Sequence, residues 1–354
     1  MNKLHNRFIK ILWLVILTFM ITGCTREIHY TENTRLKDGK YDSEYPYQPT
    51  SDKLREIMES VKLMSTLAFY EGYEFAPDSY IQAEQISDDL VDERSVQKFH
   101  FNQPATGTAT VIYRSGRKIA LLTCAHIIDF PDTAFTYFRN EEGVPTKYIQ
   151  TVSFKIRQNI NVIDFHLGGD FEILASDRHN DIALIGKDMA INTPYVIPVF
   201  NFGMGNSDEL TWGTFVYIIG YPRGEKMVTS AIVSQPTREK KSTFVIDAVF
   251  NRGFSGGIVL ALRDGVPNFE FVGMAKSVPA ETKYYLAPDK SYKLLESSLE
   301  EVYTGKPRIE TYENIYYGIT YAVTINKIAE FIDKNSVLLE QQGFKTDRFF
   351  STSN

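Results

Sequence analysis

Short apolar runs separated by polar, glycine-containing turns dominate the chain from about residue 105 onward. Such runs predict strands when they are rich in β-branched and aromatic residues and bounded by turn signals. We assign strands to residues 108–113, 118–123, 151–156, 171–175, 182–185, 214–219, 227–233, 243–248, 258–261 and 269–275. Many short strands with frequent turns suit a β-barrel architecture. The pattern therefore predicts a mostly β protein.

Two segments on either side of these strands have helical spacing instead. The final apolar stretch, residues 325–332, repeats at helical intervals and predicts a terminal helix. The earlier segment follows Ser51 and predicts a short amphipathic helix packed on the domain. Its apolar side chains are Leu54, Ile57, Val61 and Met64.

The first 23 residues predict an export signal. They carry Lys3, Arg7 and Lys10 and no acidic residue, and an apolar run over 11–22 follows. As a helix this run spans about 18 Å, which is too short for a bilayer core of about 30 Å. We therefore expect a signal peptide and not a membrane span.

The residues Ile21-Thr22-Gly23-Cys24 resemble a bacterial lipobox. This resemblance implies cleavage before Cys24 and lipidation of its thiol. The expected product is an exported bacterial lipoprotein, anchored to a membrane on the extracytoplasmic side, in the periplasm or at the cell surface. The alternative is an ordinary secretory signal followed by a coincidental cysteine.

Charge and cysteine content narrow the classes of protein further. The net charge is −6, and no basic run or basic–aromatic interleaving is present, which argues against a nucleic-acid partner. The chain has two cysteines, so lipidation of Cys24 would leave Cys124 without a disulfide partner. We interpret Cys124, two residues before His126, as a buried structural thiol and not as a reactive one.

Three separated residues form a candidate catalytic set. Ser255 lies in Gly253-Phe254-Ser255-Gly256-Gly257, where glycines allow a sharp turn that aims backbone N–H groups at one point. His126 falls just past a predicted strand end, and Asp181 opens the apolar run 182–185. A serine becomes nucleophilic when a base takes its proton and fixed donors bind the oxyanion. The order His, Asp, Ser is the order of the chymotrypsin type.

These residues resemble the catalytic motifs of trypsin-like serine proteases. Additional likeness to the HtrA/Deg branch is carried by residues 205–213, 219–222, 229–234, 247–253 and 318–323. The resemblance covers about residues 105–335. It implies two six-stranded antiparallel β-barrels with a C-terminal helix, protein or peptide substrates, and no cofactor or metal. It also implies His126 as base, Asp181 as the residue orienting it, Ser255 as nucleophile, and the N–H groups of Gly253 and Ser255 as the oxyanion hole.

Two positions around the serine bear on activation and specificity. Phe254 replaces the Asp or Asn that is usual before such a serine, so it cannot pair with a freshly cut N-terminus. We therefore expect no trypsin-style zymogen activation, while a bulky aromatic here could distort the oxyanion hole. Val249, six residues before Ser255, and Gly273 are the candidate substrate-pocket residues. An apolar Val249 argues against cleavage after Lys or Arg and favours a small or aliphatic residue.

Other residues compete for these roles. His179 lies two residues before Asp181, and we interpret it as a polar loop residue. Asp177 could rival Asp181, but the apolar run that follows Asp181 favours Asp181. His100 and His166 lack the spacing of metal ligands. Two further functions remain open: a pseudo-protease that serves as a binding or scaffold lipoprotein, and an exported esterase or other acyl-transfer enzyme with the same triad.

The expected organisation has four parts. Residues 1–23 form the signal peptide, 24–50 a lipidated tether, 51–100 the N-terminal helix and lead-in, and 101–345 the protease domain. This domain has insertions at about 129–170 and 277–313. Helical spacing predicts a helix in the second insertion, which serves either as a lid or exosite, or as surface packing. We expect no PDZ module, and the sequence leaves the oligomeric state open. The insertion's helical signals are Asp289, Tyr292, Leu295, Leu299 and Val302, with stop signals at Gly305 and Pro307.

Overall fold

The computed structural model describes residues 37–140, 142–163, 165, 170–189, 197–239, 242–289 and 303–350. The chain divides into two units, residues 1–38 and 39–354, and the second contains all the secondary structure discussed below. The predicted signal peptide, Cys24, His166 and the helical signals over 290–302 lie outside the described residues. Among the described helices, none is long and apolar enough to cross a bilayer.

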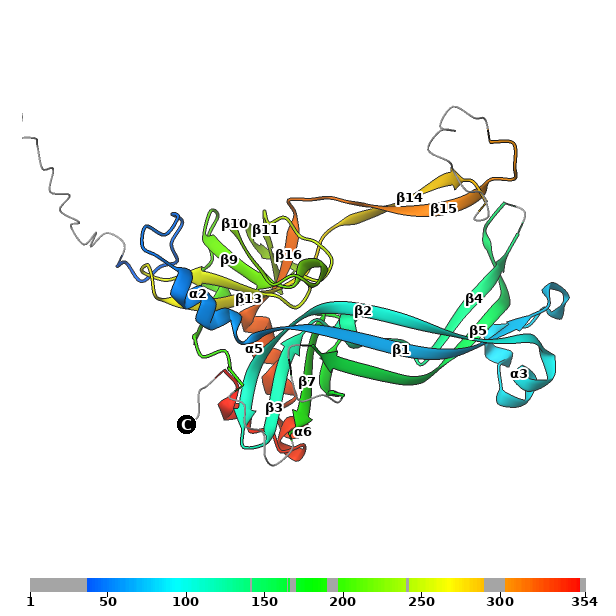
Figure 1. Cartoon of the computed structure of the whole chain (residues 1–354), viewed down its shortest axis with the longest axis horizontal. Coiled ribbons are helices and arrows are strands. Elements are labelled where there is room, and N and C mark those ends of the chain that lie inside the picture. The colour runs from blue at the N-terminus through cyan, green and yellow to red at the C-terminus, as the bar shows by residue number, and fades with distance from the viewer. Residues whose placement is uncertain are drawn as a thin grey trace, which may run out of the picture. The chain divides into compact units, whose positions relative to one another are not determined.

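The first sheet has seven strands in the order β4-β5-β1-β2-β3-β7-β6 (Figure 1). Its strands pair antiparallel throughout, and the two end strands are not paired with each other. The prediction of a closed six-stranded barrel is therefore wrong for this half, which is a curled, open sheet. The bounds are β1 Val61–Phe75, β2 Ser95–Ser115, β3 Lys118–Thr123, β4 Thr133–Arg139, β5 Pro145–Val162, β6 Glu172–Asp177 and β7 Ile182–Asp188.

The second sheet closes into a six-stranded barrel. Its order is β12-β9-β10-β11-β16-β13, and pairing between β12 and β13 completes the ring. The short β8 adds to β13 in parallel. This half fits the predicted architecture. The bounds are β8 Gly203–Met204, β9 Phe215–Gly220, β10 Met227–Arg238, β11 Thr243–Ile246, β12 Ile258–Leu262, β13 Phe269–Ser277 and β16 Thr320–Thr324.

The N-terminal helix is shorter than the apolar spacing predicts. Helix α2 covers Ser51–Met58 and ends where Ser60 donates its backbone N–H and its hydroxyl to the Ile57 carbonyl. Val61 and Met64 lie instead on β1, whose buried side chains alternate with a period of two. A single apolar set thus continues from a helix into a strand. This strand and the start of β2 bring residues of the expected lead-in, 51–100, into the first sheet.

The two predicted insertions extend the sheets. The first supplies β4 and β5, which belong to the seven-stranded sheet. The far end of this sheet has its own small core of Phe75, Ile81, Val91, Ile149 and Val152. In the second insertion, β14 (Ala280–Ala287) and β15 (Arg308–Ile315) form a separate two-stranded ribbon. It extends away from the second sheet (Figure 1).

Helices occupy the ends and connections. Helix α5 (Ile325–Lys334) confirms the predicted terminal helix, and α6 (Ser336–Gln341) follows it. Thr324 caps α5 by accepting the Lys327 N–H. The remaining helices are α3 Asp88–Arg94 and α4 Ala125–Ile128, with the 3₁₀ turns η2 Pro77–Ser79, η3 Ala83–Gln85, η4 Ser207–Glu209, η5 Pro222–Gly224 and η8 Thr346–Arg348.

The C-terminal segment seals the core beside β2. Phe344 and Phe349 are buried against the Tyr113 ring, with centroids 5.3 Å and 4.8 Å away. The Phe350 N–H donates to the Ile112 carbonyl at 2.7 Å, and the Lys345 N–H donates to the Tyr113 hydroxyl at 3.1 Å. The residues after α6 are therefore part of the main hydrophobic cluster.

We predict that Phe344→Ala lowers the free energy of unfolding by about 3–5 kcal/mol, because it leaves a cavity between Tyr113 and β7. Leu338→Ala on the partly exposed face of α6 is the matched control and should change it by less than about 0.5 kcal/mol. Urea unfolding followed by fluorescence measures both. Equal midpoints for the two variants would contradict this packing role.

Candidate functional site

The turn that carries Ser255 joins the end of β11 to β12 and depends on two glycines. Gly253 has φ +103°, and a Cβ there would lie 2.2 Å from the Tyr221 carbonyl oxygen. Gly256 has φ +86°, and its Cβ would lie 2.0 Å from the carbonyl oxygen of Thr108. Any side chain at either position would clash with backbone atoms. The sequence motif thus reflects two close backbone approaches that hold Ser255 in place.

His126 and Asp181 come from the first sheet and are brought together as the sequence predicts. His126 lies on α4 directly after β3, and Asp181 directly precedes β7. The Asp181 carboxylate accepts the His126 backbone N–H at 2.9 Å and contacts Nδ1 of its ring at 2.8 Å. Because an ionised carboxylate only accepts hydrogen bonds, this contact requires the proton on Nδ1, which makes Nε2 the acceptor nitrogen of the neutral imidazole. The arrangement fixes the tautomer that a general base requires.

Asp181 adopts a left-handed backbone conformation with φ +61°. Asp and Asn tolerate this region better than other residues that bear a Cβ. Its side chain is only 9% exposed, whereas that of His126 is 48% exposed. The pair therefore has a buried acid end and an accessible imidazole.

Ser255 is not hydrogen-bonded to His126. Its hydroxyl instead donates to the carbonyl of Lys276 at 3.1 Å, near the end of β13. The Ser255 carbonyl accepts the Thr108 N–H at 2.8 Å. The backbone of Ser255 is thus tied to the first sheet, while rotation about its Cα–Cβ bond decides what the hydroxyl contacts.

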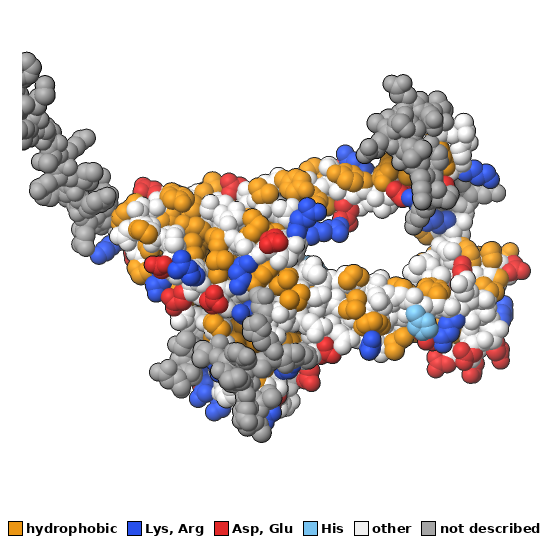
Figure 2. Space-filling model, in the orientation of Figure 1, with side chains coloured by type: hydrophobic (Ala, Val, Ile, Leu, Met, Phe, Trp, Pro, Cys, Tyr) orange, Lys and Arg blue, Asp and Glu red, His pale blue; other side chains and the backbone are white. Residues whose placement is uncertain are grey.

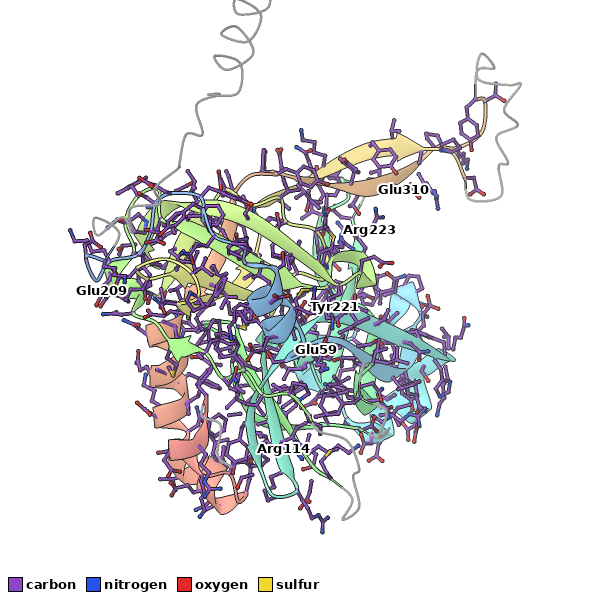
Figure 3. The ribbon with its side chains drawn as sticks, turned by 60° about the vertical axis from the view of Figure 1, so that its left-hand side comes forward. Glu59, Arg114, Glu209, Tyr221, Arg223 and Glu310 are labelled. Atoms are coloured by element: carbon purple, nitrogen blue, oxygen red, sulfur yellow. The ribbon has the colours of Figure 1, made fainter. Side chains whose placement is uncertain are left out.

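The predicted oxyanion donors have no acceptor among the residues that the structure describes. Neither the Gly253 N–H nor the Ser255 N–H forms a hydrogen bond with any residue that the structure describes. The Arg252 carbonyl accepts the Arg223 N–H at 2.7 Å, and in a trans peptide this directs the Gly253 N–H the opposite way. Tyr221 and Arg223 lie together on the adjoining turn (Figure 3).

Phe254 points away from these donors. Its ring is 2% exposed and lies in the core of the second barrel, 5.9 Å from the Phe250 ring. It also packs on Gly220, where a Cβ would lie 2.8 Å from the ring. The aromatic residue therefore anchors the turn through apolar packing.

The competing residues have other contacts. Asp177 accepts the backbone and side-chain N–H groups of Asn180. Although partial burial pushes the pKa of Asp177 upward, these hydrogen bonds outweigh it and lower the pKa. His100 lies on β2 and contacts Glu71 of β1 at 3.1 Å. None of these groups contacts the His126–Asp181 pair.

Cys124 is buried beside the pair, as the sequence interpretation has it. Its thiol lies 3.5 Å from the Ala275 carbonyl oxygen. Burial, and then the negative charge of Asp181, raise the pKa of the Cys124 thiol. Ligand atoms of Cys124, His126 and Asp181 lie within 4.8 Å of one another. The Asp181 carboxylate already accepts two hydrogen bonds from His126. The closeness of these three groups is therefore explained by the His126–Asp181 pair.

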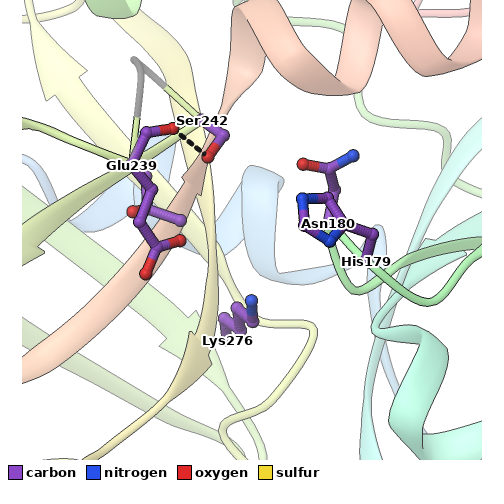
Figure 4. A pocket seen from close by; sticks show the side chains of 6 residues that line it. His179, Asn180, Glu239, Ser242 and Lys276 are labelled. Carbon is purple, nitrogen blue, oxygen red and sulfur yellow. Dashed lines mark hydrogen bonds between the residues drawn. The ribbon is translucent and has the colours of Figure 1, made fainter.

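The two predicted substrate-pocket residues lie in different surroundings. Gly273 is a close-packing position in the barrel, where a Cβ would lie 2.5 Å from both the Phe244 ring and the Val323 carbonyl oxygen. The Val249 side chain is exposed and precedes the turn that carries Ser255. A pocket of about 310 Å³ lies beside the site (Figure 4). No local sequence pattern predicts this pocket, because its residues come from separate elements. It is lined by His179, Asn180, Glu239, Ser242, Thr243 and Lys276.

Comparison with known proteins indicates a family for part of the chain. Residues 107–274 match the family model of the trypsin-like peptidase domain. This segment is therefore similar to a trypsin-like peptidase domain. The crystal structure of the serine endoprotease from Yersinia pestis aligns with 84% of this chain and 69% of its own, at 15% identity and a TM-score of 0.40. No curated protein matches the chain at a significant level.

Thr108 connects the two sheets at the turn that carries Ser255. Its buried hydroxyl donates to the Gly253 carbonyl at 2.7 Å and accepts the Tyr221 N–H at 2.9 Å. Its carbonyl accepts the Thr123 hydroxyl at 2.8 Å. Sequence inspection missed this residue, because a threonine within an apolar strand carries no motif.

We predict that Thr108→Val lowers the free energy of unfolding by about 3 kcal/mol, because it leaves a buried N–H and a buried carbonyl unpaired. Thr108→Ser keeps the hydroxyl and should recover most of that loss. Urea unfolding of the two variants measures the difference. If the two variants were equally stable, the Thr108 hydroxyl would not be the group that joins the two halves.

Proposed function

We propose that the chain is a lipid-anchored serine endopeptidase related to the HtrA/Deg branch, which hydrolyses peptide bonds by acyl transfer. The observation that carries the proposal is the double contact of Asp181 with the backbone and ring of His126, beside a glycine-fixed serine turn. The trypsin-like peptidase domain supports the serine-protease class.

The chemistry follows from these groups. The Ser255 hydroxyl rotates from the Lys276 carbonyl toward Nε2 of His126, which takes its proton as the oxygen attacks the peptide carbonyl. The N–H groups of Gly253 and Ser255 bind the resulting oxyanion. Asp181 stabilises the imidazolium, which then protonates the leaving amine. Water repeats the attack on the acyl-enzyme, and Ser255 regains its proton.

One contact favours a second candidate, a pseudo-protease that binds proteins without cleaving them. The Ser255 hydroxyl is bonded to the Lys276 carbonyl and not to His126. If that bond persists when a substrate is present, the serine cannot transfer its proton to the base.

Fluorophosphonate labelling of the full chain separates the two candidates. We expect labelling of the wild type and none of Ser255→Ala. Asp181→Asn keeps the left-handed backbone but presents the wrong tautomer of His126, and should slow labelling by about 10⁴-fold. Asp177→Asn is the matched control and should stay within about threefold of the wild type. Absence of labelling in a folded wild type would favour the pseudo-protease.

The lipid anchor is tested separately. We expect metabolic incorporation of an alkyne-labelled palmitate into the wild type and its loss in Cys24→Ser. The variant should also leave the membrane fraction, because the acyl chains supply the apolar contact with the bilayer. Incorporation that survives Cys24→Ser would place the modification elsewhere and remove the lipobox interpretation.

A further inference from the structure

The β14–β15 ribbon has two chemically different faces. Because directly paired residues of antiparallel strands lie on the same face, the strand register sorts the side chains. We call one set the apolar face: Ala280, Thr282, Tyr284, Leu286, Ile309, Thr311, Glu313 and Ile315. The other is the charged face: Glu281, Lys283, Tyr285, Ala287, Arg308, Glu310, Tyr312 and Asn314.

The charged side chains of the charged face pair with partners on the same face. Lys283 pairs with Glu281 at 3.5 Å, and Arg308 forms an ion pair with Glu310. The Tyr285 hydroxyl donates to the Glu310 carboxylate at 2.7 Å. This face therefore needs no further partner to be stable in water.

The apolar face is uncovered. Tyr284 is 73% exposed, and the paired Leu286 and Ile309 are each 70% exposed. Apolar side chains are visible along the ribbon in the space-filling view (Figure 2). Clustered apolar side chains that remain exposed on a projecting element mark a binding surface more often than single exposed ones.

The apolar face is directed toward the turn that carries Ser255. Glu313, its one charged member, pairs with Arg252 at 2.5 Å, and Arg252 directly precedes Gly253. The ribbon also continues from β13 just beyond Lys276, whose carbonyl accepts the Ser255 hydroxyl. From Lys276 to Tyr284 the chain is eight residues long, or about 26 Å when extended. A single extended ligand could therefore contact both places.

We propose that the apolar face binds an extended apolar segment of the protein substrate, about eight residues from the scissile bond. This rests on the proposed peptidase function. A narrow two-stranded face has the width of one or two extended chains, and it offers far less than the roughly 800 Å² per partner that a stable protein interface buries. Over both faces, the ribbon carries three acidic residues, one Lys and one Arg. This charge balance argues against an anionic lipid surface as the partner.

The test compares two multiple variants of the full chain. The apolar-face variant carries Tyr284→Ser, Leu286→Ser and Ile309→Ser, and the charged-face control carries Tyr285→Ser and Tyr312→Ser, which are also exposed. In a Ser255→Ala background, fluorescence anisotropy measures binding of labelled β-casein, an unfolded probe. We expect about tenfold weaker binding for the apolar-face variant and a change within about twofold for the control.

Activity gives an independent readout in the Ser255 background. The apolar-face variant should raise KM for β-casein with little change in kcat, while fluorophosphonate labelling, which reaches only the serine, keeps its wild-type rate. Equal β-casein binding by the apolar-face variant and the control would overturn the proposal. So would a loss of self-association in sedimentation, or of binding to phosphatidylcholine vesicles, with β-casein binding unchanged. Face-dependent binding without serine labelling would establish the apolar face as a binding surface but remove the peptidase function, and with it the assignment of the bound segment as substrate.

Discussion

The candidate site depends on the junction that Thr108 makes between the two sheets. This residue belongs to β2 of the open sheet, yet its N–H, hydroxyl and carbonyl all contact the serine turn or its immediate supports. The Thr108 carbonyl oxygen is also the atom with which any side chain at position 256 would clash. Burial makes each of these hydrogen bonds costly to break, because a lost partner cannot be replaced by water. The conformation of a loop in one half is thus determined by a strand in the other.

This junction explains why the candidate catalytic groups can be divided between the halves. His126 comes directly after β3 and Asp181 directly before β7 of the open sheet, and their mutual contacts need nothing from the barrel. Ser255 belongs to the barrel connection before β12. The relative position of His126 and Ser255 therefore depends on how well the halves are joined. Opening at the interface, even with both sheets intact, would remove the site, so we expect its integrity to follow interface stability more closely than the stability of either sheet.

Sequence alone predicted the local features and missed the long-range ones. Residues 108–113 and 118–123 were assigned as strands because their apolar runs and the turn between them are local signals. Val61 and Met64 were assigned to a helix because their spacing continues that of α2, and only pairing with β2 and β5 makes them part of a strand. The His126–Asp181 pair followed from motif order. The open first sheet, the role of Gly273 and the pocket at Lys276 depend on residues far apart in sequence, which no local pattern specifies.

The ribbon is connected to the serine turn by two routes of unequal strength. The Arg252–Glu313 ion pair is largely exposed, and such pairs contribute at most about 1 kcal/mol because water and salt screen them. The second route runs along β13, where the Gly256 N–H donates to the Ala275 carbonyl and the Ala275 N–H to the Gly257 carbonyl. These hydrogen bonds are buried, so water and salt do not screen them. The strand that makes them, β13, continues along the chain into β14. The ion pair can therefore select which face of the ribbon is turned toward the site, whereas any change in ribbon position that reaches Ser255 must pass through β13 and the Lys276 carbonyl.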